Sequence, residues 1–156
     1  HSGELLKTFT TPQKHTNKVI GFTYDRKYII TGYFRFFVWD TTTGNLVRQF
    51  QGSGGANAIA FSPDAPLFAT SQGGLEEAEE IKEIRLWNYE TGKLIRQIGE
   101  SYTKEKWIED IRFTPDGKQL VSCSRDKKIK FWNPTDGQII KVLEGHEDAS
   151  RNRPFC

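Results

Sequence analysis

Histidine, serine, cysteine and acidic side chains are the groups in this chain that could do chemistry, and their spacing gives none of them a catalytic setting. The three histidines, His1, His15 and His146, lie far apart, whereas a metal site needs ligands at short, fixed spacings. No Gly-x-Ser-x-Gly turn presents a serine nucleophile. We therefore expect a protein that is not an enzyme, with no catalytic, cofactor-binding or metal-binding residues.

An acidic segment between residues 72 and 83 is the first candidate binding element. Its glutamates lack the alternating spacing and the central glycine of a calcium loop. The segment is either a solvated excursion of the chain or a loop that selects a basic partner by charge. The candidate partner-binding residues here are Glu76, Glu77, Glu79 and Glu80.

A second candidate combines basic side chains with a tryptophan. Aromatic rings beside charges on an exposed loop are typical of protein-binding hot spots, although Trp107 is equally suited to begin a buried strand. Bases and aromatic rings also suit nucleic acid, but the alternation in residues 128–131 is that of any half-exposed strand, so we expect no nucleic acid partner. The candidate partner-binding residues are Lys104, Lys106, Trp107 and Arg125.

The elements that position these side chains follow from a repeat. Three tryptophans are each followed by aspartate or asparagine, then by a glycine five residues after the tryptophan, then by a short alternating apolar strand. The pairs are Trp39 and Gly44, Trp87 and Gly92, and Trp132 and Gly137. Residues 4–9 repeat the strand alone, with no tryptophan before it. A fixed-period repeat indicates stacked units that bury their faces against their neighbours.

The units also share their beginning. A phenylalanine opens a turn that ends in aspartate, in residues 22–25, 61–64 and 113–116. Proline fixes φ and aspartate bonds its own backbone, so both suit a tight turn. A second strand follows, and a third carries the tryptophan. Four short strands per unit, with tryptophans 48 and 45 residues apart, predict the blades of a β-propeller.

These segments resemble WD repeats, and residues 110–133 are the most typical copy. The resemblance implies an all-β fold, a WD-type β-propeller that is incomplete in one chain, with three four-stranded antiparallel blades. We expect a single partial domain over residues 1–156. Its parts are an orphan outer strand at 4–9, blades at 15–50, 54–98 and 104–143, and the start of a truncated blade or a tail at 144–156.

WD repeats often hold a blade together through hydrogen bonds among a histidine, a serine or threonine, an aspartate and the tryptophan indole. Such bonds satisfy polar groups inside the blade. The resemblance implies an incomplete version of this structural network in every unit. Its expected members are His15, Thr31 and Trp39 in the first blade, Ser71 and Trp87 in the second, and Ser122, Asp126 and Trp132 in the third.

The spacing from the turn phenylalanine to the tryptophan differs among the units. It is 17 residues in the first, 26 in the second and 19 in the third. This predicts a shortened hairpin at residues 32–35 and an enlarged loop at 72–83, both between the second and third strands.

Three blades cannot close a ring, because propellers typically have four to eight. We expect either a fragment of a larger propeller or a homo-oligomer that self-associates through open, apolar flanks. The expected function is a non-catalytic protein–protein interaction scaffold that binds other proteins or peptides. The alternative is a regulatory or substrate-docking propeller segment of a larger multidomain enzyme.

Composition adds limits on partners and location. The net charge is +2 with both signs interspersed, and no apolar run has the length of a bilayer span, so we expect no membrane partner. Cys123 and Cys156 do not make a disulfide framework, and we expect a reduced thiol at Cys123. These features predict an intracellular, cytoplasmic protein.

Overall fold

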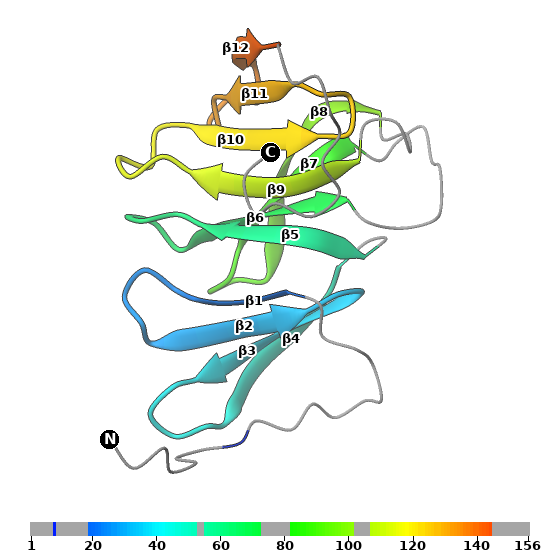
Figure 1. The fold of residues 1–156 in the computed structure, drawn as a ribbon. Coiled ribbons are helices and arrows are strands. Elements are labelled where there is room, and N and C mark those ends of the chain that lie inside the picture. The colour runs from blue at the N-terminus through cyan, green and yellow to red at the C-terminus, as the bar shows by residue number, and fades with distance from the viewer. Residues whose placement is uncertain (1–7, 9–18, 53–54, 73–81, 102–106, 145–156) are drawn as a thin grey trace, which may run out of the picture.

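The computed structural model describes residues 8, 19–52, 55–72, 82–101 and 107–144, and the regular elements in these ranges are strands. They form three four-stranded antiparallel sheets in which consecutive strands pair (Figure 1), which confirms the predicted all-β architecture. No helix in the described ranges has the length and apolar character that a membrane span requires. Sheet A contains β1 (Val19–Phe22), β2 (Tyr28–Gly32), β3 (Arg35–Asp40) and β4 (Leu46–Gln51); sheet B contains β5 (Ala56–Phe61), β6 (Leu67–Gln72), β7 (Lys82–Asn88) and β8 (Lys93–Ser101); sheet C contains β9 (Ile108–Phe113), β10 (Leu120–Ser124), β11 (Ile129–Trp132) and β12 (Ile139–Leu143).

A hydroxyl and an aspartate fix the turn between the first and second strands of each sheet. In every case the serine or threonine hydroxyl donates to the aspartate Oδ1 two residues later. The aspartate also accepts a backbone amide in sheets A and C. The three pairs are Thr23 to Asp25 at 2.7 Å, Ser62 to Asp64 at 2.8 Å, and Thr114 to Asp116 at 2.6 Å.

A glycine completes the turn between the third and fourth strands. Its amide donates to the carbonyl of the residue after the tryptophan, at 2.8 Å in all three sheets. These glycines have positive φ, a region that residues with a Cβ rarely adopt. They are Gly44 (φ 78°), Gly92 (φ 72°) and Gly137 (φ 80°). The constant spacing from tryptophan to glycine is therefore the length of one turn.

The three sheets pack face to face, with their first strands β1, β5 and β9 side by side (Figure 1). Seam AB, between sheets A and B, is aromatic: the Phe68 ring lies 5.3 Å from Phe36 and stacks on Trp87 at 6.3 Å. Burial of one such side chain stabilises the fold by about 1.5–3 kcal/mol. Seam BC, between sheets B and C, is mainly aliphatic and includes Ala60, Ile84, Leu86, Ile98, Ile111, Leu120 and Trp132.

The first sheet contains the shortened hairpin that the spacing predicts. Tyr33 and Phe34 alone join β2 to β3. A Cβ on Gly32 would lie 2.2 Å from the Arg35 carbonyl oxygen, so this tight turn requires glycine.

Several predicted boundaries lie outside the described residues. The strand at 4–9, apart from residue 8, and nearly all of the enlarged loop at 72–83 belong to this group. The predicted blade starts at residues 15, 54 and 104 do so as well. The blade boundaries therefore stay predictions.

Cys123 on β10 is disulfide-bonded, so the expectation of a reduced thiol at this position is wrong. Its partner lies outside the described residues. The expectation rested on the absence of a cysteine framework, and sequence spacing alone does not show which cysteines meet in space.

Candidate protein-docking surface

A hydroxyl on the second strand holds the tryptophan indole inside each blade. In sheet A, Trp39 Nε1 donates to Thr31 Oγ1 at 3.1 Å. In sheet C, Trp132 Nε1 donates to Ser122 Oγ at 2.9 Å. The structure thus brings together two pairs that the sequence names. All four side chains are buried, and the bond gives each indole N–H the acceptor that packing would otherwise deny it.

In sheet B the indole partner is Thr70 and not the predicted Ser71. Trp87 Nε1 donates to Thr70 Oγ1 at 3.0 Å, whereas Ser71 Oγ accepts the Ala58 amide at 2.9 Å. The reason is the alternation of side chains along a strand. Trp87 lies opposite Phe68, so the residue two positions later shares its face. The same count holds in the other two sheets.

Asp126 reaches the tryptophan of its blade through a lysine. Its carboxylate accepts hydrogen bonds from the Ser124 hydroxyl and the Lys128 amide, and lies 3.1 Å from Lys130 Nζ. Lys130 is buried, and its ammonium lies 5.6 Å from the centre of the Trp132 ring. Burial acts to raise the pKa of Asp126, but hydrogen bonds from Ser124 and Lys130 outweigh it and lower that pKa.

Trp107, Glu109 and Arg125 form a corner at the start of β9, which we call the docking corner. The Arg125 guanidinium carbon lies 4.9 Å from the centre of the Trp107 ring, and Arg125 Nε lies 2.7 Å from Glu109 Oε1. The Arg125 amide also donates to the Trp107 carbonyl at 2.9 Å. Trp107 is half-buried and Arg125 is exposed, so the corner presents a cation stacked on a ring. The sequence singled out Trp107 and Arg125, while Glu109 is added by the structure.

The remaining predicted site residues lie outside the described residues and stay predictions. They are His15, Glu76, Glu77, Glu79, Glu80, Lys104 and Lys106. Within the described ranges, no group of three or more histidine, cysteine, aspartate or glutamate side chains is placed to hold a metal ion.

The face of sheet A that points away from sheet B carries exposed apolar residues, Ile20 and Phe22 of β1, which we call flank A. Ile20 and Ile111 both lie two residues before the turn phenylalanine of their sheet. Ile111 is 1% exposed inside seam BC, whereas Ile20 is 68% exposed. Phe22 is 59% exposed, while its counterparts in sheets B and C are half-buried.

The opening at flank A is confined to the first strand. On the same face, Ile29 of β2 and Phe37 and Trp39 of β3 are buried. Flank A therefore lies near the side of the sheet where β1, β5 and β9 meet, and not at the outer edge.

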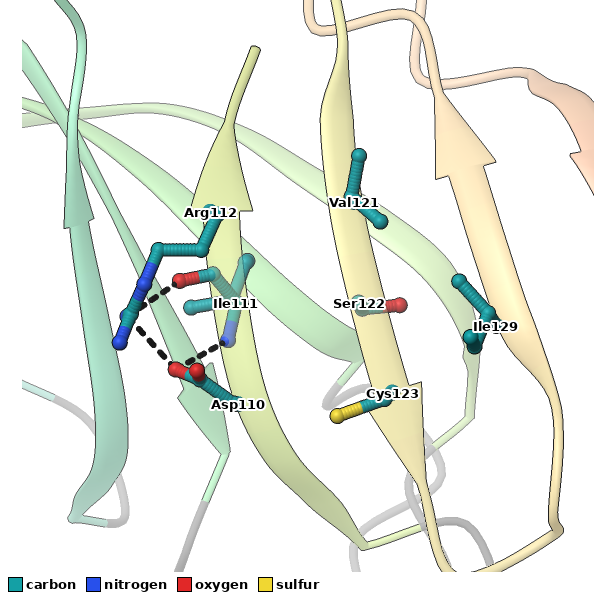
Figure 2. A pocket seen from close by; sticks show the side chains of 7 residues that line it. All are labelled: Asp110, Ile111, Arg112, Val121, Ser122, Cys123 and Ile129. Carbon is teal, nitrogen blue, oxygen red and sulfur yellow. Dashed lines mark hydrogen bonds and ion pairs between the residues drawn. The ribbon is translucent and has the colours of Figure 1, made fainter. Parts of the chain in front are cut away.

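The face of sheet C that points away from sheet B is covered by neither of the other two described sheets, and we call it flank C. Val121 and Phe131 are half-buried there, whereas Ala69 and Leu86 at the same positions of sheet B are buried in seam BC. A cavity of about 240 Å³ opens on this face (Figure 2). Its lining comes from β9, β10 and β11 and consists of Asp110, Ile111, Arg112, Val121, Ser122, Cys123 and Ile129.

Asp110 and Arg112 place an ion pair on flank C. Arg112 Nη1 lies 2.6 Å from Asp110 Oδ1, which also accepts the Ile111 amide at 2.8 Å (Figure 2). Asp110 Oδ2 is buried and has no hydrogen-bond partner within the described part of the chain. Burial raises the pKa of Asp110, against the lowering effects of the Ile111 amide and Arg112.

The repeat in the sequence matches a known family. The family model described as "WD domain, G-beta repeat" matches residues 44–74 and 92–133. The chain belongs to the WD-repeat family. Each matched range begins just before an outer strand, β4 or β8, and continues into the next sheet. The WD repeat in the sequence is therefore offset by one strand from the blade in the structure.

Curated relatives of this WD-repeat chain are much longer than the chain itself. WD repeat and SOCS box-containing protein 1 of Homo sapiens is 37% identical over 117 residues, which are 71% of this chain and 25% of the relative. Periodic tryptophan protein 2 of Arabidopsis thaliana is 29% identical over 121 residues, 77% of this chain and 12% of the relative. The Periodic tryptophan protein 2 homolog of Schizosaccharomyces pombe is 25% identical over 154 residues, 96% of this chain and 17% of the relative.

Reasoning from the sequence missed the ion pair on flank C. A signal for it lies in the WD repeat itself, at the position just before the turn phenylalanine. Gly21 and Ala60 occupy that position in sheets A and B, and Arg112 occupies it in sheet C. The change from a small residue to arginine at this position is that signal.

Proposed function

We propose that this chain is a non-catalytic protein–protein interaction scaffold, and that further blades fill flanks A and C in the complete propeller. The supporting observation is the contrast between Ile111, 1% exposed in seam BC, and Ile20, 68% exposed at the same position. Repeat units are stabilised by the interfaces with their neighbours. An apolar side chain that stays in water forgoes about 1.5–3 kcal/mol of burial free energy. Flank A therefore has the surface of a seam without its second sheet.

The further blades come from a longer parent chain or from a second copy. The chain spans 12%, 17% and 25% of the three relatives described above, which supports a fragment of a larger propeller. In the isolated chain, two copies of flank A offer each other an apolar surface. We therefore expect the isolated chain to form a homo-oligomer through flank A.

Light scattering tests this proposal. The isolated chain should show a mass above 17.9 kDa that rises with concentration. The Ile20→Asp variant should shift toward the monomer mass, because a buried carboxylate without a partner is costly. Ile95→Asp is the matched control, since Ile95 is 50% exposed on β8 and lies outside both flanks. A chain that stays at 17.9 kDa at every concentration would contradict self-association.

Docking of other proteins or peptides is proposed at the docking corner. Glu109 Oε1 pairs with Arg125 Nε at 2.7 Å. The guanidinium has further N–H donors that can bind carboxylates or carbonyls of a partner. A stacked arginine and tryptophan are the residue types that dominate protein interfaces. On an array of acidic peptides, Arg125→Ala should lose at least about fivefold in binding, and Lys93→Ala on the exposed start of β8 should not. Equal binding by both variants would show that the docking corner does not bind these peptides.

The acidic residues Glu76, Glu77, Glu79 and Glu80 are proposed as a second docking element, for basic partners. Reversal of these four charges should weaken capture of basic peptides while the thermal unfolding midpoint stays unchanged. Unchanged capture by a folded variant would eliminate the segment. A cytoplasmic location stays a prediction.

A further inference from the structure

Flank C differs from the two seams at the first-strand positions that face the next sheet. The residue just before the turn phenylalanine is Gly21 in sheet A, Ala60 in sheet B and Arg112 in sheet C. Two residues earlier, Ala58 of sheet B corresponds to Asp110 of sheet C. Where sheet B has two small side chains in seam BC, sheet C therefore has a basic and an acidic side chain on flank C.

The small residues matter because the first strands of neighbouring sheets approach closely. A Cβ added to Gly21 would lie 2.3 Å from the Phe61 ring, and Ala60 is buried in seam BC. A blade that met flank C in the same way would set its phenylalanine on Arg112 and its isoleucine on Asp110. Burial of charged groups against apolar side chains carries a desolvation penalty. Flank A of a second copy is therefore a poor match for flank C.

Asp110 indicates what a fitting occupant supplies. Its Oδ1 is satisfied by the Arg112 guanidinium at 2.6 Å and the Ile111 amide at 2.8 Å. Its Oδ2 is buried and accepts no hydrogen bond within the described residues, which leaves a desolvated acceptor without compensation. Arg112 already balances the charge of the carboxylate. A neutral donor therefore fits Oδ2 better than a second cation.

We propose that flank C binds a strand of different sequence, which places a neutral amide or hydroxyl donor against Asp110 Oδ2 and an aliphatic side chain in the adjoining cavity. That cavity, of about 240 Å³, has an apolar wall that includes Val121 and Ile129 (Figure 2). The inference rests on the proposed function, because it specifies which blade flank C accepts. Asp110 and Arg112 are then the specificity-determining residues of this flank.

One receptor and three probes made from this chain test the proposal. The immobilised receptor is the Ile20→Asp variant, whose flank A is disabled and whose Asp110 and Arg112 are unchanged. The probes are the unaltered chain, Ile20→Asn and Ile20→Lys, because docking in the manner of a seam sets position 20 against Asp110. Binding is measured by biolayer interferometry in a reducing buffer, which opens the disulfide of Cys123.

The Ile20→Asn probe should bind at least about tenfold more tightly than the unaltered chain, because its amide reaches a charged acceptor. Ile20→Lys should gain less, since its ammonium approaches Arg112. Asp110→Ala in the receptor should abolish the advantage of the asparagine probe. Lys118→Ala, in an exposed turn of the receptor, is the matched control and should preserve that advantage.

Equal binding of Ile20→Asn and the unaltered chain would overturn the proposal, and so would the absence of binding by both. Either result would mean that flank C does not select a hydrogen-bond donor. The proposed function fails by a different route, since a monomeric chain in light scattering rejects self-association through flank A. A monomeric chain would leave unchanged the predicted order of affinities of the three probes for the receptor.

Discussion

Seam BC and flank A present the same blade position to different surroundings. Ile111 and Ile20 follow the same pattern in the repeat, yet Ile111 is 1% exposed and Ile20 is 68% exposed. The repeat places an apolar residue at this position of the blade both where a neighbouring sheet covers it and where none of the described sheets does. The comparison teaches that burial in this protein is a property of the stack of sheets and not of the single blade.

The largest expected effect separates these two isoleucines. Ile111→Ala should lower the free energy of unfolding by about 2–5 kcal/mol, because it opens a cavity inside seam BC. Ile20→Ala should change it by about 0.5 kcal/mol or less when measured on dilute chain. Urea unfolding followed by tryptophan fluorescence gives both values. A similar loss of unfolding free energy in the two variants would contradict the difference in burial between seam BC and flank A.

A second prediction concerns the indole bond inside the stack. Thr70→Val keeps the side-chain volume but leaves the buried Trp87 Nε1 without the acceptor it has at 3.0 Å. We expect a loss of about 1–3 kcal/mol in the free energy of unfolding. Thr91→Val is the control, since Thr91 lies in an exposed turn. If the two threonines cost the same in urea unfolding, the indole bond does not stabilise the blade.

The third prediction compares two aspartates of sheet C across pH. The pKa of Asp126 is lowered in the folded protein, so its stabilising contribution is complete above the unfolded pKa of about 3.9 and is lost as pH falls through the folded pKa. The pKa of Asp110 is raised by burial, so its charged form destabilises the fold increasingly as pH rises through the folded pKa.

Replacement by asparagine should therefore act in opposite directions. Near pH 7, Asp126→Asn should destabilise the fold and Asp110→Asn should stabilise it, and both differences should shrink below about pH 4. Thermal unfolding at pH 3 to 7 measures them. If both substitutions changed the stability in the same direction across this pH range, the predicted difference between the surroundings of Asp126 and Asp110 would be wrong.

Local turn chemistry made much of this fold predictable. Thr114 Oγ1 donates a hydrogen bond to Asp116 Oδ1, two residues later, at 2.6 Å. A short stretch of sequence is therefore enough to specify this turn. Strand alternation is also local, and counting by it would have given Thr70 in place of Ser71 as the partner of Trp87.

The candidate sites were less predictable, because they depend on contacts between distant residues. Arg125 stacks on Trp107 across the β9–β10 pair, and no spacing rule fixes that distance of 4.9 Å. The unpaired oxygen of Asp110 depends on how β9 and its own neighbours bury it. Such features follow from tertiary packing, which periodicity does not encode.

Carbene labelling with mass spectrometry, at rising concentrations of the isolated chain, tests the central claim most directly. At low concentration Ile20 and Phe22 should be labelled strongly and Ile111 hardly at all, in line with exposures of 68%, 59% and 1%. As copies associate, labelling of Ile20 and Phe22 should fall while that of Ile95 on β8 stays constant. Labelling of Ile20 as weak as that of Ile111 in dilute chain, or unchanged at every concentration, would contradict a flank that seeks a further blade.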